Sequence, residues 1–598
     1  MKKKRIVFIP QLIRTFGREF AFVFRMAPKH ATILTILQFL IGVIPAIELF
    51  LGARIVDELI QLQGTAFWSP HLSFYVIVAL TLLGIQRLVF SFNDYIVNYL
   101  RSYLQLAVNN RIHDAVLRLD LPTLERSHVH TLITYLKDQS WRPQQMTYVV
   151  FQMLGNLAAS FSYVGISLTF SPFYTFLFLL AVLPSLVVSV WAIHHGQKIA
   201  FGKASLWKQV WYFENLFRLR RSLVELMVHQ VGAYFASRYR RVYEEVISKE
   251  MAIEARRLFG ALIANIGAFG VYILVYVKVV QHALNGFLSI GQFTLYIGAF
   301  INIERFLVTQ AWEVATLIEH TKYLDTFREL ESLRPKVRDR VGATILEEVK
   351  KIEFVKVSYR YPNTKELALN GISFLIRAGE RVAVVGENGA GKSTLMKLLM
   401  RLYEPTKGKI FINGHDYRTY TLASLRKQIG ITFQDFMEYS LTTRENIGLG
   451  ELTLMDDQSA IESAAKRAGI HERIERLPKK YETILGHEVH EEGVELSGGE
   501  WQKLALARSL IKSASVLILD EPTAALDARS EYHFFTELFS KTKKQTVIVI
   551  SHRFSSVRVA DRIFVLKDGK LAEQGTHTEL NQKNGLYAEL YHLQTKDF

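Results

Sequence analysis

The sequence contains no cysteine among its 598 residues, which excludes disulfide bonds and thiolate metal sites. It also lacks a basic stripe with interleaved aromatic residues, so its net charge of +16 does not indicate a nucleic-acid partner. Basic cytoplasmic loops beside a lipid bilayer explain this charge better. A cleavable signal peptide is not expected, because the apolar stretch after residues 2–5 is short and is interrupted by Arg14 and Arg18.

Long apolar runs dominate the first half of the chain. A membrane-spanning helix needs about 20 mostly apolar residues. Six stretches meet this requirement, near residues 31–52, 74–96, 148–170, 173–193, 258–280 and 287–308. Only Ser171 and Pro172 separate the third stretch from the fourth, which predicts a tight hairpin across the bilayer.

Lysine and arginine are distributed unevenly among the connections between these stretches. They are frequent in one set, with eight in residues 1–30, six in 101–143 and twelve in 194–257. The other set contains none, over residues 57–70, 171–172 and 281–289. Because basic residues accumulate in cytoplasmic loops, we expect both termini and both long loops to be cytoplasmic.

The two long basic loops lack clusters of glycine and proline and are predicted to be helical over residues 104–119 and 205–249. We interpret them as membrane helices that continue into the cytoplasm and turn near residues 120–128 and 214–226. We expect these turns to dock on a soluble domain. A basic amphipathic stretch at residues 9–25 predicts an interfacial helix ahead of the first span.

The domain boundary is predicted where the chain becomes charged, in Arg-Pro-Lys-Val-Arg-Asp-Arg at residues 334–340. A strand-like stretch follows at residues 352–357. The expected organisation is therefore a transmembrane domain over residues 1–325, a linker over 326–348 and a second domain over 349–598.

Charged side chains within apolar stretches are costly in a bilayer and tend to face a cavity or a partner. Glu48 and Glu304 are the best candidates for lining a path across the membrane, because apolar sequence flanks them most closely. Interhelical pairing, or a position just outside the hydrocarbon, is the alternative interpretation for each. The same alternatives apply to the other charged residues near the stretches: Arg87, Asp94, Lys278, Arg305 and Glu313.

A phosphate-binding loop is predicted from Gly-Glu-Asn-Gly-Ala-Gly-Lys-Ser-Thr at residues 386–394. An apolar β-branched run precedes it and a helical run follows, which is the order that such a loop requires. Its backbone N–H groups and the helix N-terminus favour phosphate. We expect Lys392 to reach the β- and γ-phosphates and Ser393 to ligate Mg²⁺. The other loop residues expected at the nucleotide are Gly386, Asn388, Gly389, Gly391 and Thr394.

An acidic pair follows the apolar run Val-Leu-Ile-Leu at residues 516–519. Asp520 is placed to hold Mg²⁺ through water, and Glu521 to polarise an attacking water molecule. The alternative is an exposed acidic pair that merely ends a strand, which the phosphate loop makes less favourable. The second domain is therefore predicted to be an α/β domain that binds ATP with Mg²⁺.

Leu-Ser-Gly-Gly-Glu at residues 496–500 follows the phosphate loop at a distance of about 100 residues. With these motifs the chain resembles ATP-binding cassette (ABC) exporters in which six spans precede one nucleotide-binding domain. The resemblance is most specific over residues 353–594. It implies a polytopic α-helical membrane domain followed by an α/β P-loop ATPase domain of the ABC type, in a bacterial cytoplasmic (inner) membrane.

Individual roles are also implied by the resemblance. Tyr361 matches the aromatic residue that stacks on adenine, and Gln434 matches the glutamine that touches Mg²⁺ and relays the nucleotide state to the membrane helices. His552 matches the histidine that contacts the γ-phosphate and is implied to act in catalysis with Glu521. The residues implied to bind nucleotide across the interface between two chains are Ser497, Gly498, Gly499 and Asp527.

One chain carries each half of such a site once, so a second half-transporter chain is the expected partner. A homodimer is favoured, because the catalytic residues are intact. The main hypothesis is ATP-driven export of an amphipathic cargo, with a weak preference for a peptide over a lipid or lipophilic drug. A gated channel or a sensory partner is less favoured. The sequence departs from the family pattern at Glu500, where many members have glutamine.

Overall fold

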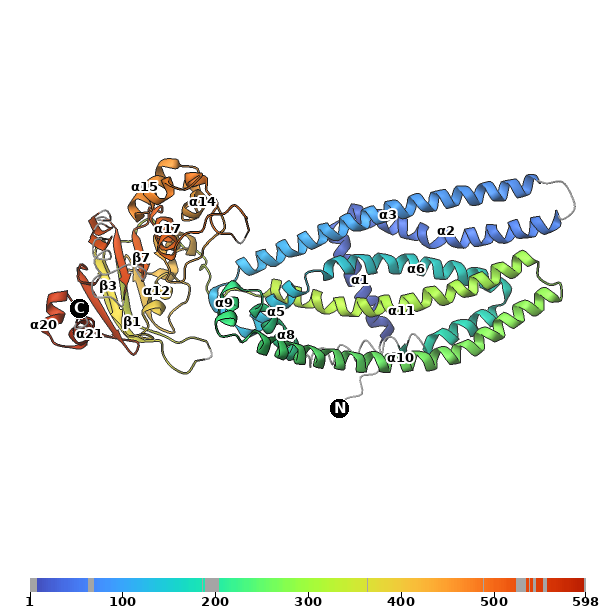
Figure 1. Ribbon diagram of the computed structural model, residues 1–598, viewed down its shortest axis with the longest axis horizontal. Helices are drawn as coiled ribbons and strands as arrows, with labels where there is room; N and C mark the ends of the chain where they lie inside the picture. The colour runs from blue at the N-terminus through green and yellow to red at the C-terminus, as the bar shows by residue number, and fades with distance from the viewer. Residues whose placement is uncertain are drawn as a thin grey trace. The chain divides into compact units, whose positions relative to one another are not determined.

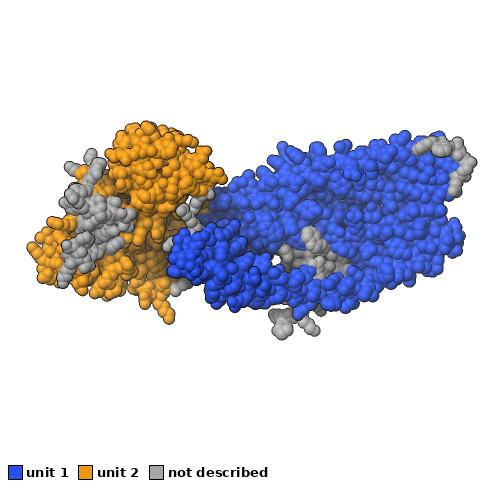
Figure 2. All heavy atoms as spheres, in the orientation of Figure 1, with its two compact units in different colours: residues 1–116, 131–333 blue, residues 117–130, 334–598 orange. Residues whose placement is uncertain are grey.

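The computed structural model divides the chain into two compact units, which Figure 2 colours separately. The helical unit comprises residues 1–116 and 131–333, and the α/β unit comprises 117–130 and 334–598. The structure describes residues 8–62, 69–184, 187–188, 204–362, 364–487, 489–522, 534–536, 538–540, 542, 545–551 and 557–595.

The described part of the helical unit consists mainly of long helices (Figure 1). The labelled helices that lie in it wholly or mostly are α1 (Phe8–Met26), α2 (Pro28–Gln61), α3 (Pro70–Leu117), α5 (Ser127–Asp138), α6 (Arg142–Phe170), α8 (Ala204–Leu216), α9 (Arg220–Val228), α10 (Gly232–Leu284) and α11 (Ile290–Ser332). An apolar helix also covers Pro172–Pro184. Within the described residues, α2, α3, α6 and α10 are long and apolar enough to cross a membrane.

These four helices contain the expected stretches 31–52, 74–96, 148–170 and 258–280. Most of the stretch 287–308 lies in α11, in which Gln292, Asn302, Glu304 and Arg305 interrupt the apolar residues. The stretch 173–193 begins in the helix Pro172–Pro184 and extends beyond the described residues. Among the described residues, length and composition thus identify four spanning helices, and the expected number of six is not confirmed.

Two helices continue far beyond the thickness of a bilayer. The 48 residues of α3 and the 53 residues of α10 correspond to roughly 70–80 Å at 1.5 Å per residue, whereas the hydrocarbon core is about 30 Å thick. The predicted helix over residues 205–249 is interrupted twice, since α8, α9 and the start of α10 are separate elements. The second long loop therefore has a short helix of its own at α9.

Small residues allow the membrane helices to pack closely. A Cβ atom at Gly42 of α2 would collide with the carbonyl oxygen of Gly155 on α6. Polar pairs lie in the same interior, where the Gln38 side chain donates to Asn93 Oδ1 at 3.0 Å and Asn156 donates to Glu313 Oε1 at 2.6 Å. These contacts join α2 to α3 and α6 to α11.

The α/β unit contains two sheets in the part of the chain that the structure describes. One has the order β2-β1-β4-β5 and the other β10-β9-β3-β8-β7-β6. The strands are β1 (Lys351–Tyr359), β2 (Leu369–Arg377), β3 (Arg381–Gly386), β4 (Lys407–Ile412), β5 (His415–Asp416), β6 (Ile429–Thr432), β7 (Val516–Asp520), β8 (Thr546–Ile550), β9 (Arg562–Lys567) and β10 (Lys570–Gly575).

The helices of this unit are α4 (Leu121–Leu124), α12 (Lys392–Leu399), α13 (Leu422–Lys427), α14 (Thr443–Gly448), α15 (Gln458–Ala468), α16 (His471–Glu475), α17 (Gly498–Leu510), α20 (His577–Gln582) and α21 (Leu586–Thr595). Single 3₁₀ turns lie at Tyr417–Thr419, Leu452–Leu454 and Lys480–Glu482. Neighbouring strands from β9 to β6 pair in parallel, as in other sheets that are buried on both faces.

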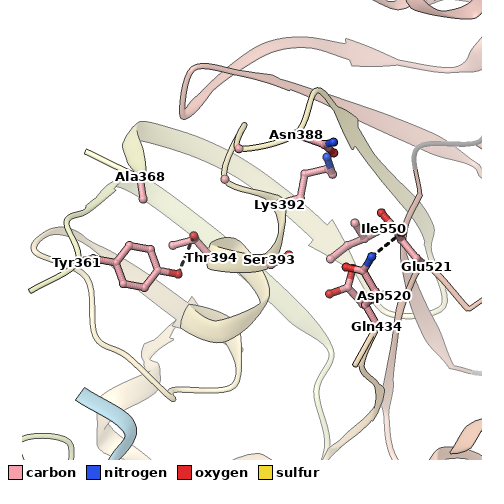
Figure 3. Close-up of a pocket in the computed structure, with 12 residues that line it drawn as sticks. Tyr361, Ala368, Asn388, Lys392, Ser393, Thr394, Gln434, Asp520, Glu521 and Ile550 are labelled. Atoms are coloured by element: carbon pink, nitrogen blue, oxygen red, sulfur yellow. Dashed lines mark hydrogen bonds between the residues drawn. The ribbon is translucent and has the colours of Figure 1, made fainter. Parts of the chain in front are cut away.

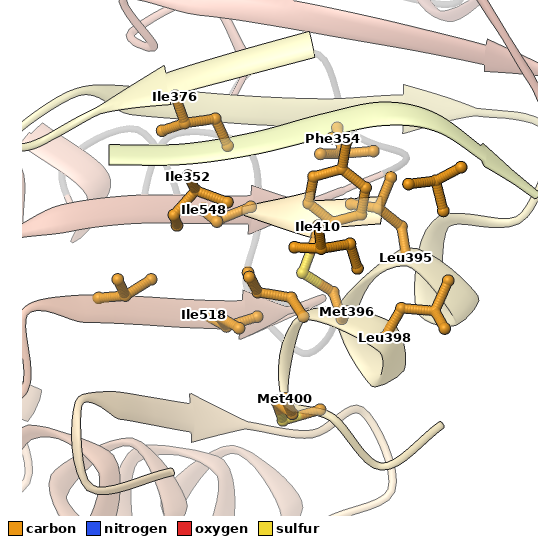
Figure 4. Close-up of a cluster of buried hydrophobic side chains, with 14 of the residues drawn as sticks. Ile352, Phe354, Ile376, Leu395, Met396, Leu398, Met400, Ile410, Ile518 and Ile548 are labelled. Carbon is orange, nitrogen blue, oxygen red and sulfur yellow. The ribbon is translucent and has the colours of Figure 1, made fainter. Parts of the chain in front are cut away.

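The main core of the unit lies between the two sheets and α12 (Figure 4). Phe354 of β1 and Ile410 of β4 pack in the same cluster as Leu395 of α12 and as Ile518 and Ile548 of the parallel sheet. This packing fixes the first turn of α12 at the carboxyl end of β3. Ligands bind at the carboxyl ends of parallel strands in open α/β sheets.

The boundary between the units falls at residues 333 and 334. The expected linker, residues 326–348, begins inside α11, which ends at Ser332. The tip of the first long loop belongs to the α/β unit. There Asp120 accepts hydrogen bonds from the backbone N–H groups of Lys336 and Val337, at 3.1 and 2.8 Å, and Leu121 packs against the core.

Candidate functional site

A cavity of about 330 Å³ opens at the carboxyl ends of the parallel strands (Figure 3). It brings together most of the residues predicted to bind nucleotide on one chain. The residues that line it are Tyr361, Ala368, Asn388, Gly389, Gly391, Lys392, Ser393, Thr394, Gln434, Asp520, Glu521 and Ile550.

The loop between β3 and α12 has a backbone that only glycine tolerates at two positions. Gly391 has φ +101°, and a Cβ atom there would lie 2.6 Å from the carbonyl oxygen of Ala368. Gly386 does not line the cavity, and a Cβ atom on it would collide with the carbonyl oxygen of Leu566. The loop therefore wraps around space in which backbone N–H groups can approach an anion.

Lys392 crosses the inside of this loop. Its Nζ atom donates to the carbonyl oxygens of Gly386 and Glu387, at 2.7 and 2.9 Å. Burial lowers the pKa of Lys392, and the nearby carboxylates of Glu521 and Asp520 partly oppose this effect. The ammonium group is thus held in the cradle where phosphate oxygens are expected.

Asp520 ends β7 beside the loop. Burial raises the pKa of Asp520 to about 6, and the neighbouring Glu521 adds to the rise while Lys392 opposes it. Asp520 is half-buried, and a carboxylate in this position with too little positive charge beside it fits a divalent cation. Gln434 and Ser393 line the same cavity and supply further oxygen atoms, which are the ligands that Mg²⁺ prefers.

Glu521 is fixed by hydrogen bonds from several directions. It is a non-glycine residue with φ +49°, a conformation that persists only where surrounding contacts hold it. Its N–H donates to the carbonyl oxygen of Ile550 at 2.9 Å, and its Oε2 atom accepts from the side chain of Gln434 at 3.0 Å (Figure 3). Its carbonyl oxygen accepts from the side chain of Gln502 at 3.0 Å.

Gln502 is a site residue that the sequence analysis did not identify. Its side chain is 8% exposed and reaches from α17 to the backbone of Glu521. A single glutamine in a helix has no distinctive pattern. The only signal was its place, five residues after Ser497.

Tyr361 lies at the opposite end of the cavity from the acidic pair (Figure 3). Its hydroxyl group and that of Thr394 form a hydrogen bond of 3.0 Å. The rings of Tyr359 and Tyr403 pack against it edge-on, with centroids 5.0 and 5.5 Å away. These contacts fix an aromatic ring at the entrance to the phosphate loop.

Among the described residues expected to act across a chain interface, Ser497, Gly498 and Gly499 do not line this cavity. Ser497 is the N-cap of α17 and, like Gly498, is exposed, while Gly499 follows in the first turn. Asp527 and His552 lie outside the described residues. The structure thus assembles one half of the predicted site and places the signature segment elsewhere on the unit.

The two candidates in the helical unit have aromatic neighbours. Glu48 of α2 is within electrostatic range of Tyr163, as is Arg305. Glu304 of α11 is within range of Tyr272 and Tyr276. Both glutamates are partly exposed in the single chain.

Comparison with known proteins agrees with this arrangement. The family model described as ABC transporter matches residues 369–524. The subtilin transport ATP-binding protein SpaT of Bacillus subtilis is 26% identical over 599 residues, covering 99% of this chain and 95% of the relative. The nisin transport ATP-binding protein NisT of Lactococcus lactis subsp. lactis is 26% identical over 95% of this chain and 94% of the relative.

A higher identity over a shorter length is found with an ATP-dependent lipid A-core flippase of Alcanivorax borkumensis, which is 35% identical over 62% of each chain. Among solved structures, a bacterial Atm1-family ABC exporter with ATP bound superposes with a TM-score of 0.72 and 26% identity, covering 94% of this chain and 97% of that one. The chain therefore belongs to the ABC exporters, as a half-transporter in which a helical membrane domain is fused to an ABC ATPase domain.

Proposed function

We propose that two copies of this chain form an exporter that moves an amphipathic cargo outward across a bacterial inner membrane. The observation that carries the proposal is the division of the nucleotide site within one chain. The phosphate loop, Gln434, Asp520 and Glu521 share one cavity, whereas Ser497 is exposed at the start of α17. A second chain supplies the signature residues, so that each ATP is held between two chains.

Each side chain of the cavity has a distinct role in hydrolysis. Tyr361 stacks on adenine, and Lys392 moves from the loop carbonyls to the β- and γ-phosphates. Ser393, Gln434 and Asp520 would hold Mg²⁺, which neutralises phosphate charge when it is bound. Glu521, held by Gln434 and Gln502, orients the attacking water. Asp527 and His552 complete the site at the interface.

Coupling to the membrane follows from ATP binding more tightly to the closed dimer than to the open one, because only differential affinity shifts such an equilibrium. The loop tip at α4, whose Asp120 binds the backbone at residues 336 and 337, transmits closure. The second loop does the same through α9. Both chain termini are cytoplasmic in this scheme.

Six spans surround the path in the proposed exporter. They are α2, α3, α6, the helix that begins at Pro172, α10 and α11. Glu48 and Glu304 line the path and meet polar or cationic groups of the cargo. The helix α1 lies at the interface of the membrane.

A peptide is the favoured cargo, because the relatives matched over nearly their full length are named for the transport of subtilin and nisin, which are peptides. Export of a lipid or drug is the second candidate. It is favoured by the lipid A-core flippase and by a putative multidrug export protein of Bacillus subtilis, which is 37% identical over 52% of this chain.

The proposal is tested by the ATPase activity of the purified protein in lipid nanodiscs, with peptides, lipids and drugs added one at a time. Stimulation by cationic or amphipathic peptides supports peptide export and justifies a vesicle transport assay. Stimulation by lipids or drugs alone overturns the peptide assignment in favour of the second candidate. Crosslinking across the predicted interface, between Ser497→Cys and Asn388→Cys, tests the two-chain site.

A further inference from the structure

Glu500 is a charged residue that the proposed function does not use. It lies three residues after Ser497, in the first turn of α17. A carboxylate at this position favours the N-terminus of the helix but repels a phosphate bound in front of it. The family's more frequent glutamine avoids this conflict, so this chain needs another means of removing the charge.

Both carboxylate oxygens of Glu500 have partners. Oε2 accepts a hydrogen bond from the Ser497 N–H at 2.8 Å and completes a capping box, in which the Glu500 N–H donates to Ser497 Oγ. Oε1 accepts from Nε of Arg473 at 2.6 Å. The signature turn is therefore tied to α16 by a charged pair.

The surroundings hold this pair in place. Ile474, next to Arg473, packs in the same buried cluster as Trp501 and Leu504 of α17. The side chains of Arg473 and Glu500 are 39% and 26% exposed. Burial alone would raise the pKa of Glu500, but the Ser497 N–H and the Arg473 guanidinium lower it below its ordinary value. The carboxylate is therefore ionised at neutral pH and is neutralised by Arg473.

We propose that Arg473 is a positioning residue for ATP hydrolysis, which neutralises Glu500 and so lets the signature turn accept the γ-phosphate of the partner's ATP. The inference rests on the proposed two-chain site. A glutamine at position 500 would keep the capping box, since its side-chain oxygen accepts the same N–H. It would also remove the charge that Arg473 compensates.

The test is a double-mutant cycle on ATP hydrolysis in nanodiscs, with Arg473→Ala, Glu500→Gln and the double variant. Arg473→Ala is expected to raise KM for ATP about fivefold, the upper range for a pair of this exposure. Glu500→Gln and the double variant are expected to stay within about twofold of wild type. A purely structural role for Arg473 predicts that the double variant is as impaired as Arg473→Ala. That result, or an unchanged KM in Arg473→Ala, overturns the inference.

Two controls separate this inference from the proposed function. Ser497→Ala tests the two-chain site itself, and an unchanged KM in this variant overturns that site. If KM rises in Ser497→Ala but stays unchanged in Arg473→Ala, only the role of Arg473 is overturned. Arg476→Ala removes an exposed arginine of the same segment. If KM for ATP rises equally in this variant, the effect comes from the net charge of the segment, and the specific role of Arg473 is overturned. If Arg473→Ala does not fold, Arg473→Gln completes the same cycle.

Discussion

The two units of this chain bury different kinds of side chain. In the α/β unit, the strands β3, β7 and β8 are almost entirely apolar and buried, and the polar residues gather at their carboxyl ends around the cavity. In the helical unit, large apolar side chains such as Phe74 and Phe161 face outward, while polar pairs join the helices inside. This second pattern suits lipid as the surrounding medium.

The difference teaches how function is encoded in each unit. In the α/β unit, polar side chains converge on one cavity and make a chemical site. In the helical unit, the polar pairs Gln38–Asn93 and Asn156–Glu313 connect one helix to another, and Gln38 also lies against Gly155, next to Asn156. Substitutions are expected to separate the two cases: large effects on turnover in the first, and small effects on stability in the second.

Glu521→Gln is expected to produce the largest effect. The substituted amide keeps the size of the side chain and its bond to Gln434, but it cannot accept a proton from water. We expect kcat for ATP hydrolysis to fall about 1000-fold, while ATP still binds and the dimer stays closed. Single-turnover hydrolysis and nucleotide occlusion measure the two parts. Turnover near that of wild type would exclude Glu521 as the key carboxylate.

Tyr361→Ala is expected to weaken ATP binding without a comparable loss of kcat. Stacking of an aromatic ring on a base contributes roughly 1–3 kcal/mol, so KM for ATP is expected to rise about 5- to 150-fold. Tyr361→Phe is the matched control, because it keeps the ring and removes only the hydrogen bond to Thr394. An unchanged affinity in the alanine variant would contradict stacking.

Gln502→Met is expected to lower kcat about fivefold and to leave KM unchanged, because it removes one hydrogen bond of about 1 kcal/mol and preserves volume. The lost bond is the one to the carbonyl oxygen of Glu521, whose backbone is in the left-handed region. The measurement is steady-state hydrolysis, with thermal unfolding as the control. A lower unfolding temperature with wild-type kcat would show that Gln502 only stabilises the fold.

Much of the nucleotide site was predictable from the sequence. Gly391 has φ +101°, and a side chain there would collide with the carbonyl oxygen of Ala368. Both constraints restrict this position to glycine, which is why the loop can be recognised from its sequence. Gln502 left no such motif, because its role depends on how far a helix lies from one carbonyl group. Spacing alone also could not place Ser497, whose expected partner is a second chain.

The helical unit was predictable only in outline. Apolar runs located helices, but α11 carries Glu304 and Arg305 within its apolar part, and length and composition do not single it out. The break between α8 and α9 falls at residues 217–219, inside the turn predicted near residues 214–226, although no glycine or proline marks its exact position. Contacts such as that of Asn156 with Glu313 join residues far apart in sequence and follow no pattern along the chain.

Asn93→Leu is expected to give the smallest effect and to test the comparison directly. Asn93 accepts a hydrogen bond from Gln38 inside an expected span, and such bonds between membrane helices average about 0.6 kcal/mol. Asn446→Leu makes the same change in the α/β unit. There the buried Asn446 donates to the Tyr439 carbonyl oxygen and accepts from Arg508, both at 2.9 Å, and the loss of both hydrogen bonds costs about 2–3 kcal/mol.

Calorimetry in nanodiscs measures both losses, and added ATP identifies the transition of the α/β unit by raising its temperature. The contrast follows from the unfolded reference state. In lipid, Gln38 still finds other polar groups, whereas Asn446 is fully buried in the folded α/β unit, and its replacement removes one hydrogen bond from Arg508 and one from the Tyr439 carbonyl oxygen. Equal losses of stability in the two variants would mean that the hydrogen bond of Asn93 contributes as much as the hydrogen bonds of Asn446. In that case the pair of Asn93 with Gln38 would hold α2 and α3 in a specific register. The expectation that polar pairs of the helical unit contribute only small amounts of stability would then be wrong for this pair.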